Sequence, residues 1–245
     1  MPVMTSQTPA AGSPVALVTG ASRGLGRALA TALAVREWHL VLSARDPDRL
    51  AAVAGELSRR TQVTAVAGDV ADPRHRQGLA AAVAHAGRLD LLVNNASELG
   101  PSPLPPLTAH PLDVLQRVYA VNTLAPLGLL QLLFGTLRSG GGRVLNVSSD
   151  AAVEPYSGWG GYGSSKAALD HLSAVLAVEL PELRVYAVDP GDMRTDLHQA
   201  AFPGEDIRDR PEPSTVVPAL LRLVEGDLPS GRYRAADLAA AAAAL

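Results

Sequence analysis

Short apolar runs rich in valine and leucine recur along the chain, and most of them are followed by a longer segment with helical periodicity. A continuous apolar run bounded by turn residues is typical of a strand that is buried on both faces. Strands that alternate with helices predict a parallel sheet covered on both sides. The sequence therefore predicts an α/β fold, a doubly wound parallel sheet of about seven strands in a single domain. The expected strands span residues 15–18, 38–43, 62–67, 89–93, 144–147, 183–188 and 231–235.

The chain divides into one domain with a short segment at each end. Residues 14–235 carry the alternating pattern. We expect residues 1–13 to form a flexible leader, and the alanine-rich residues 236–245 to form a weakly ordered tail, either a short helix or a frayed end. Within the domain, residues 192–213 combine prolines, a glycine and mixed charges, which predicts a mobile flap beside the substrate site.

Composition excludes several classes of function. The formal net charge of −3 and the pI near 6.1 give no basic surface of the kind that nucleic-acid binding requires. The chain has no cysteine, and its histidines have no metal-ligand spacing, so we expect neither disulfides nor a metal site. The first residues lack the segments of a signal peptide, and we count no apolar stretch near the roughly 18 residues that span a bilayer. We expect a cytoplasmic protein without nucleic-acid or membrane partners.

A glycine-rich turn, Thr19-Gly-Ala-Ser-Arg-Gly-Leu-Gly26, follows the first predicted strand and precedes a helical segment. In such a strand–turn–helix unit, free amides at the start of the helix can hold a pyrophosphate. The spacing of Gly20, Gly24 and Gly26 differs from the G-x-G-x-x-G of dinucleotide-binding turns. The same three roles still map onto it: a tight turn, close approach of the backbone to phosphate, and close packing of helix on strand. A plain strand-to-helix connection is the alternative, and we favour the phosphate site.

The end of the second predicted strand indicates which dinucleotide is preferred. An enzyme that selects the free ribose is expected to carry an acidic residue there, whereas this strand ends in Ser43 and Arg45. Asp46 precedes Pro47, the combination of a helix N-cap with proline at the first helical position, so we assign Asp46 to the helix start. Arg45 and Arg23 then offer two cations for a 2′-phosphate. The alternative for each arginine is a solvated surface charge.

Residues 143–166 combine a strand with three side chains suited to acid–base chemistry. Tyr162 and Lys166 are four residues apart, so a helix places them on one face. A phenol has an ordinary pKa of about 10, and a nearby ammonium lowers that pKa by favouring the phenolate. Ser149 can direct its hydroxyl to the same substrate oxygen. Together they form a proton donor, a tuning charge and a hydrogen-bond donor for a carbonyl that becomes an alcohol, although a lone Tyr-x-x-x-Lys also arises by chance.

One amide is placed within a long apolar segment. Residues 112–138 predict a helix in which Asn122 lies among valines and leucines. A buried amide is unfavourable unless it is hydrogen-bonded. Asn122 therefore either supports a bend in the backbone or serves the site, and we favour the site.

The order of these motifs resembles that of the single-domain short-chain dehydrogenase/reductase family, over about residues 14–235. The matching elements are the TGASRGLG, NNAS and YGSSK segments, with Asn122 and Ser149. The resemblance implies a Rossmann-type fold and catalytic roles for Ser149, Tyr162, Lys166 and Asn122. The cofactor contacts that we predict are Gly20, Ser22, Arg23, Gly24, Leu25, Gly26, Arg45, Asp69, Val70, Asn95, Ala96, Tyr162, Lys166, Pro190, Gly191, Met193 and Thr195. Residues 146–166 also look like the corresponding part of sepiapterin-reductase-type carbonyl reductases.

One position departs from the family's pattern. The family usually has Asn-Asn-Ala-Gly where this chain has Ser97. A glycine there allows close approach of the backbone, so serine is expected to narrow the site or to restrict φ. Because serine is small, we expect the change to be tolerated.

The leading hypothesis is an NADPH-dependent reductase of a small-molecule ketone or aldehyde, reversible as an alcohol dehydrogenase. The cofactor would supply hydride while Tyr162 gives a proton to the carbonyl oxygen that Ser149 polarises. A non-catalytic dinucleotide-binding sensor is the alternative, and a sugar epimerase or dehydratase would need a larger substrate domain. The residues expected around a partly apolar substrate pocket are Ala151, Tyr156, Trp159, Met193 and Phe202.

Association is expected as well. The helices that begin near Leu112 and Tyr162 carry more apolar surface than one sheet face can cover, and the resembled family commonly pairs them between subunits. The chain is therefore expected to form a homodimer or homotetramer.

Overall fold

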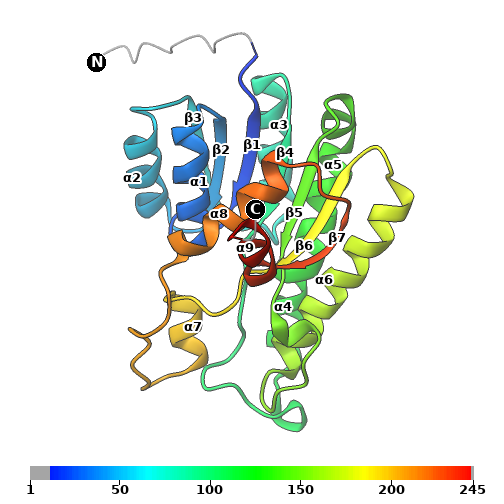
Figure 1. The fold of residues 1–245 in the computed structure, drawn as a ribbon. Helices are drawn as coiled ribbons and strands as arrows, with labels where there is room; N and C mark the ends of the chain where they lie inside the picture. The colour runs from blue at the N-terminus through cyan, green and yellow to red at the C-terminus, as the bar shows by residue number, and fades with distance from the viewer. Residues whose placement is uncertain (1–11, 244–245) are drawn as a thin grey trace.

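The computed structural model describes residues 12–243 and consists of a seven-stranded, entirely parallel sheet between two layers of helices (Figure 1). The strand order is β3-β2-β1-β4-β5-β6-β7, which confirms the predicted fold class. Every residue of β1 and β2 is buried, as their largely apolar sequences predict. The strands are β1 (Val15–Thr19), β2 (His39–Ala44), β3 (Val63–Ala67), β4 (Leu91–Asn94), β5 (Arg143–Val147), β6 (Arg184–Asp189) and β7 (Gly231–Arg234).

Helices cover both faces of the sheet, because alternate strand residues point into two separate apolar clusters. One cluster packs α1, α2, α8 and α9, and the other packs α3, α5 and the end of α6. The helices are α1 (Gly24–Val35), α2 (Pro47–Leu57), α3 (Pro73–Ala86), α4 (Leu112–Tyr119), α5 (Ala125–Ser139), α6 (Gly160–Glu179), α7 (Asp196–Ala201), α8 (Pro213–Glu225) and α9 (Ala235–Ala243).

The sheet changes its winding direction between β1 and β4. From β1 the chain passes outward to β2 and β3, then crosses to β4 and continues to β7 on the other side. Parallel pairing, such as Thr19 opposite Ser43, brings the carboxyl ends of the strands to one edge. Open α/β sheets bind their ligands at such a switch point. We therefore expect the ligand site among the loops that follow the strands at this edge.

The long apolar helix is interrupted. Between α4 and α5 the chain forms a π-helical turn, Ala120–Leu124, that contains Asn122. The whole run Leu112–Ser139 is long and apolar enough to cross a membrane by length and composition, contrary to our expectation from the sequence. Half of its most apolar window is buried inside the protein, and the leucines of α5 pack against the sheet. We therefore assign this run to the core of the domain.

The two ends of the domain differ in what the structure describes. Residues 1–11 of the expected leader lie outside the described residues. The alanine-rich C-terminal segment forms α9, whose Leu238 is buried in the core and whose backbone carbonyl accepts a hydrogen bond from Arg222. The short-helix alternative is therefore confirmed, because alanine has the highest helix propensity. The expected flap contains α7, and its mobility stays a prediction.

Candidate active site

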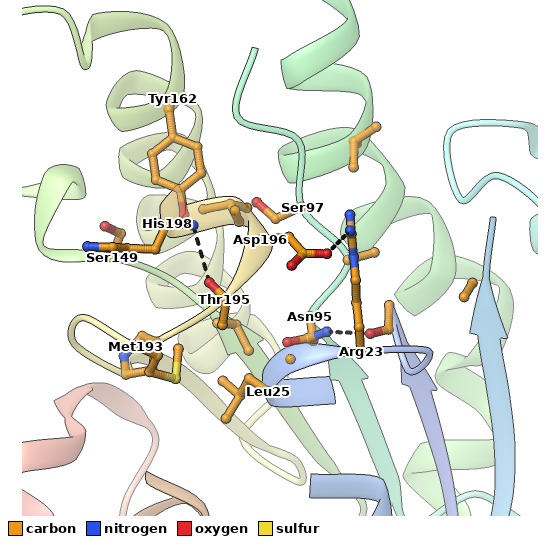
Figure 2. Close-up of a pocket in the computed structure, with 18 of the residues that line it drawn as sticks. Arg23, Leu25, Asn95, Ser97, Ser149, Tyr162, Met193, Thr195, Asp196 and His198 are labelled. Carbon is orange, nitrogen blue, oxygen red and sulfur yellow. Dashed lines mark hydrogen bonds and ion pairs between the residues drawn. The ribbon is translucent and has the colours of Figure 1, made fainter. Parts of the chain in front are cut away.

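A cleft of about 570 Å³ runs along the carboxyl edge of the sheet (Figure 2). We distinguish two parts of this cleft. The nucleotide arm is lined from residues 20–25, 44–49 and 68–70, and the catalytic arm is lined from residues 147–150 and 159–166. The start of the flap and the loop after β4 lie between the two arms and complete the lining. The volume of this cleft and its lining from both arms suit an extended ligand that reaches both arms.

Two glycines allow the turn after β1 to touch the loop after β4. Gly20 has a φ of +65°, and a Cβ on it would lie 2.7 Å from Asn95 Nδ2. A Cβ on Gly26 would lie 2.4 Å from the Gly20 carbonyl oxygen and 2.5 Å from Asn95 Nδ2. The Asn95 amide donates to the carbonyls of Thr19 (2.9 Å) and Gly20 (3.2 Å), which joins the two segments. The Arg23 side chain does not cap α1, so the amides that begin this helix stay open to a ligand.

The arginines of the nucleotide arm are exposed and paired with acids. The side chains of Arg23 and Arg45 are each 55% exposed. Arg45 Nη1 donates to Glu98 Oε2 at 2.9 Å, and Arg23 pairs with Asp196 at the start of α7. Exposed ion pairs contribute only about 0–1 kcal/mol, so an anionic ligand can replace either acid.

The second strand end is arranged as its sequence predicts. The Asp46 carboxylate accepts hydrogen bonds from the backbone amides of Asp48 (3.1 Å) and Arg49 (3.0 Å), which confirms Asp46 as the N-cap of α2. Arg49, which the sequence analysis did not select, lines the same arm, and its Nε lies 3.3 Å from Asp46 Oδ2. The arm thus carries a third arginine beside the two that were predicted.

Asp69 lines the far end of the nucleotide arm beside Val70. Its carboxylate accepts from the Ala71 amide at 2.9 Å and pairs with Arg117 at 2.6 Å. Burial alone would raise the pKa of Asp69, but the Ala71 amide and the Arg117 guanidinium outweigh burial and hold this pKa below its usual value. Asp69 is therefore a fixed, ionised acceptor in this arm.

The catalytic arm brings together Ser149, Tyr162 and Lys166, as the motif spacing predicts. Tyr162 and Lys166 lie one turn apart on α6, with only 6% and 1% of their surfaces exposed. Lys166 Nζ donates to the Val147 carbonyl at 2.7 Å and lies 5.6 Å from the centre of the Tyr162 ring. Ser149 follows β5, and its hydroxyl donates to Asp150 Oδ1 at 2.9 Å. In Figure 2, Tyr162 and Ser149 lie at one end of the cleft and Arg23 at the other.

Burial controls the pKa of both titrating groups in this arm. Burial raises the pKa of Tyr162 to about 12, and the opposing hydrogen bonds from Ser97 and Ser149 do not overcome it. Burial also lowers the pKa of Lys166 to about 8. Burial therefore outweighs any lowering of the tyrosine pKa by the lysine here, and the expected value below 10, which also depends on the positive charge of an oxidised nicotinamide, stays a prediction. The physical reason is that desolvation penalises the phenolate, while the ammonium is bound to a backbone carbonyl.

The sequence left two roles open for Asn122, support of a backbone bend or service to the site, and favoured the second. It lies in the π-helical turn and is 1% exposed. Its Oδ1 accepts from the Glu98 amide at 2.8 Å, and its Nδ2 donates to the Glu98 carbonyl and to Ser165 Oγ, both at 2.9 Å. Ser165 in turn donates to the Tyr162 carbonyl at 2.6 Å. The amide therefore fixes the loop after β4 against the helix that carries the tyrosine.

Aromatic side chains form the wall of the catalytic arm. The Trp159 ring centre lies 5.7 Å from that of Tyr162 and 5.9 Å from that of Phe202, and Ala151 belongs to the same apolar cluster. Met193 lines the cleft, as expected. Tyr156 lies outside the lining, 47% exposed, and donates to Asp150 Oδ2 at 3.0 Å.

Nearly all the predicted site residues line this one cleft, and their roles in binding and catalysis stay predictions. Gly26 and Asn122 lie behind the wall instead, where they position neighbouring segments. The predicted residues that do line it are Gly20, Ser22, Arg23, Gly24, Leu25, Arg45, Asp69, Val70, Asn95, Ala96, Ser149, Tyr162, Lys166, Pro190, Gly191, Met193 and Thr195.

The sequence analysis missed several ionisable residues of the lining, namely Arg49, Arg117, Asp150, Asp189, Asp192, Arg194, Asp196 and His198. Arg49 and Arg117 belong to no motif that we used, and only the tertiary fold brings them to the cleft, whereas Asp192, Asp196 and His198 lie in the predicted flap of residues 192–213. Asp150 had a local signal, because it directly follows the predicted catalytic serine.

This fold and cleft define a class: a doubly wound α/β oxidoreductase with a dinucleotide-sized site that ends at a serine, a tyrosine and a lysine. A family model described as short chain dehydrogenase matches residues 14–206. The chain is 37% identical to the sepiapterin reductase of Rattus norvegicus over 207 residues, 78% of each protein. An alcohol dehydrogenase of Thermococcus sibiricus, solved in complex with 5-hydroxy-NADP, superimposes with a TM-score of 0.82 at 28% identity, over 91% of this chain and 96% of the other.

The chain therefore belongs to the short-chain dehydrogenase family, and it is an enzyme of that family, which acts on CH–OH and C=O groups. A protein of Pseudomonas syringae assigned to the same family has a TM-score of 0.86 at 31% identity, and the match covers 94% of this chain and 98% of that one.

Proposed function

We propose that this protein is an NADP(H)-dependent oxidoreductase that interconverts a ketone or aldehyde and an alcohol. The observation that carries the proposal is the convergence of Ser149, Tyr162 and Lys166 at one end of a cleft whose other arm is lined with arginines. The three side chains come from the loop and the helix α6 that both follow β5, and α6 turns Tyr162 and Lys166 back toward the loop that carries Ser149.

Tyr162 is the proton donor to the substrate oxygen in this proposal. Its raised pKa keeps the phenol protonated at neutral pH, which suits the direction of carbonyl reduction. Ser149 turns its hydroxyl from Asp150 to the substrate oxygen and polarises the carbonyl. Trp159 and Phe202 exclude water beside the phenol. When it is bound, the nicotinamide cofactor supplies the hydride.

Lys166 acts as a fixed donor in the floor of the site. One of its three N–H groups is used by the Val147 carbonyl, which leaves two for the hydroxyls of a bound cofactor. Because burial lowers its pKa to about 8, the lysine is charged at neutral pH but titrates within the range of enzyme assays.

The residues of the nucleotide arm fit an NADP cofactor. The close contacts of Gly20 and Gly26 leave a backbone turn that phosphate can approach. Arg45 and Arg23 offer replaceable ion pairs for a 2′-phosphate, and no acidic residue ends β2 in a position to select a free ribose, since Asp46 caps α2. A related alcohol dehydrogenase was solved with a bound NADP derivative, which also supports NADP as the cofactor. We infer that NADPH is preferred over NADH.

The experiment that tests this function is NADPH oxidation across a panel of ketones, aldehydes, quinones and pterins. Sepiapterin belongs in the panel because sepiapterin reductases are among the similar proteins. We expect carbonyl-dependent oxidation of NADPH and a much smaller rate with NADH. Equal catalytic efficiency with both cofactors would contradict the NADPH preference.

A non-catalytic dinucleotide sensor is the alternative, and the buried, hydrogen-bonded catalytic arm favours the enzyme. If no carbonyl in the panel is reduced while NADPH still binds tightly, the sensor is the better reading. An epimerase or dehydratase has no specific support in the structure.

Association and location complete the proposal. Exposed apolar side chains on α4 to α6 include Leu112 (73% exposed), Leu124 (58%) and Val178 (82%). A homodimer or homotetramer would cover such side chains, and sedimentation velocity at micromolar concentration tests it, with a monomer as the contradicting result. We further propose a cytoplasmic enzyme with a small-molecule carbonyl or alcohol substrate, and fractionation of cells that express the tagged chain tests the location.

A further inference from the structure

The last strand, β7, contributes a side chain to the catalytic arm from outside every motif described above. Arg232 lies on β7, beyond residues 14–206 that the family model matches. Its Nη2 donates to the Ser149 carbonyl oxygen at 3.0 Å, and its Nε donates to Asp170 Oδ2 at 2.8 Å. One guanidinium therefore joins the loop that carries Ser149 to α6, the helix that carries Tyr162.

The bond between Arg232 and Asp170 is a partly buried ion pair. The Asp170 side chain is 13% exposed and that of Arg232 is 29% exposed. Within residues 12–243, the other carboxylate oxygen, Asp170 Oδ1, is buried and has no hydrogen-bond partner. A mostly buried carboxylate is costly without a partner, so Asp170 depends on Arg232. Because Asp170 is fixed on α6, it sets the direction in which the guanidinium points.

Two ties hold the segment after β5 against α6. Lys166 Nζ donates to the Val147 carbonyl at 2.7 Å, and one helical turn further along α6, Asp170 holds Arg232 on the Ser149 carbonyl. The first tie ends at the last residue of β5. The second reaches two residues farther, to the residue whose hydroxyl must meet the substrate oxygen.

The Ser149 carbonyl has a second donor, and this donor separates position from folding. The Ala152 amide donates to the same oxygen at 3.2 Å, within the short turn that follows Ser149. This local bond moves with the loop, so it does not fix the loop to the rest of the domain. It also keeps the carbonyl satisfied if the arginine is removed. Loss of Arg232 therefore loosens the position of Ser149 without leaving its carbonyl unpaired.

We propose that Arg232 is a positioning residue that holds Ser149 within reach of the substrate oxygen, with Asp170 directing its guanidinium. The inference rests on the proposed function, in which the Ser149 hydroxyl polarises a carbonyl beside Tyr162. A guanidinium is rigid and planar, so bonds at Nε and Nη2 fix the two bonded groups relative to each other. A displacement of about 1 Å in a reacting group can lower a rate about 10²-fold.

Substitutions at Arg232 test the proposal by separating kcat from cofactor binding. Arg232→Lys keeps a cation beside Asp170 but loses the planar pair of bonds, so kcat of carbonyl reduction should fall about 3–10-fold while the midpoint of urea denaturation stays near that of the parent. Arg232→Ala should lower kcat about 10–30-fold. In both variants the Kd of NADPH should change less than about twofold, because Arg232 does not line the cleft.

The matched control is Arg36→Ala, which removes the same two kinds of bond far from the cleft. Arg36 Nε lies 2.6 Å from Glu225 Oε1, and its Nη1 donates to the Ala32 carbonyl at 3.2 Å. None of these three residues lines the cleft. This variant should keep the parent kcat.

A second measurement does not depend on activity. Ser149–Asp150 is the one Ser-Asp dipeptide in the chain, so labelling with ¹³C′-serine and ¹⁵N-aspartate gives a single peptide resonance that reports the Ser149 carbonyl. This carbonyl carbon should shift upfield in Arg232→Ala, because it loses a hydrogen bond, and should not shift in Arg36→Ala. Asp170→Ala should shift it in the same direction. The double variant should match Arg232→Ala, because Asp170 acts through the arginine.

The outcomes are distinguishable. An unchanged Ser149 carbonyl resonance in Arg232→Ala overturns the proposal. So does a fall in kcat that merely follows a loss of NADPH affinity or of folding stability, because that pattern indicates a structural role. A parent-like kcat in Arg232→Lys also overturns it, since charge alone would then suffice. If the parent protein reduces no carbonyl at all, the proposed function fails, and the carbonyl resonance still decides whether Arg232 holds Ser149.

Discussion

The two arms of the cleft are held by different kinds of interaction. On the nucleotide arm, Arg23 and Arg45 are more than half exposed and paired with acids from other segments. On the catalytic arm, Tyr162 and Lys166 are almost fully buried, and the pKa of each is displaced by burial. An exposed ion pair is weak and can exchange one anion for another, whereas a buried group cannot change its partners without changing its proton affinity. Exchangeable contacts suit the binding of a cofactor, and fixed contacts suit proton transfer.

The choice of basic residue follows the same division. The chain has 21 lysines and arginines, and Lys166 is the single lysine among them. A guanidinium stays charged in every environment, whereas a lysine readily changes its pKa when it is buried. The nucleotide arm therefore uses arginine, whose charge is constant, and the catalytic arm uses lysine, whose charge responds to burial.

The largest effect on turnover is expected when the catalytic arm loses its proton donor. Tyr162→Phe keeps the ring contact with Trp159 but removes the hydroxyl. We expect turnover of any accepted carbonyl to fall about 10³-fold, the usual range for the loss of a general acid. NADPH affinity, measured by fluorescence titration, should change less than about threefold, because the nucleotide arm is untouched.

The control for this change is Tyr233→Phe on β7, which removes a hydroxyl that donates to the Pro229 carbonyl, away from the cleft. It should keep the parent rate. Comparable turnover in Tyr162→Phe and Tyr233→Phe would show that the buried phenol is not the proton donor.

The next largest effect tests the backbone of the nucleotide arm. In Gly26→Ala the new methyl group would lie 2.4 Å from the Gly20 carbonyl oxygen, a backbone atom that cannot move aside cheaply. We expect the free energy of unfolding to fall by about 2–3 kcal/mol and NADPH binding to weaken with it. The matched change Gly55→Ala meets no atom within 4 Å on the exposed face of α2 and should stabilise the protein by about 0.5–1 kcal/mol. Urea denaturation measures the free energy of unfolding of both variants. Equal values for the two would contradict the claim that close packing at Gly26 excludes a side chain.

The contrast between the arms also separates what the sequence could predict from what it could not. The strands, the glycine turn and the Asp46 cap depend on short-range patterns, and all three were predictable. The π-helical turn at Asn122 was not, because residues 112–138 have an unbroken helical pattern and the bonds that hold the amide come from Glu98 and Ser165. The raising of the Tyr162 pKa by burial was not predictable for the same reason, since burial is a tertiary property.

Lys166→Met tests the cost of burying a charge. Because the pKa of Lys166 falls from 10.5 to about 8 on folding, the buried ammonium destabilises the native state by about 3 kcal/mol below pH 8. This cost disappears as the pH rises from 8 to 10.5, where the unfolded chain also loses its proton. Allowing about 1 kcal/mol for the lost bond to the Val147 carbonyl, we expect the variant to be about 2 kcal/mol more stable at pH 7 and to lose that advantage by pH 10.

Denaturation at pH 7 and at pH 9.5 measures this difference, while carbonyl reduction by the variant should be impaired throughout. Lysine labelled with ¹³C at Cε provides an independent check, because the chain has one lysine and therefore one resonance. A pKa above 10 for that resonance would contradict the structure. If Lys166→Met is no more stable than the parent at pH 7, then local hydration removes the free-energy cost of burying the Lys166 ammonium.

The smallest effect is expected on the nucleotide arm. It decides whether a bound phosphate can replace the acidic partners of the arginines there. Arg45→Ala removes a guanidinium that is now bound to Glu98, so NADPH should lose the bond while NADH loses nothing. We expect NADPH affinity to fall about tenfold, less at high salt, with NADH affinity unchanged, because exposed charges are screened. Arg27→Ala, whose pair with Glu56 lies outside the cleft, is the matched control.

Glu98→Gln makes the reverse test: it frees Arg45 and removes a carboxylate that a 2′-phosphate must displace, so NADPH should bind about 2–5-fold more tightly. If both Arg45→Ala and Glu98→Gln leave the ratio of NADPH to NADH affinity unchanged, the pair does not lie in the phosphate site, and cofactor selection must come from Arg23 or Arg49.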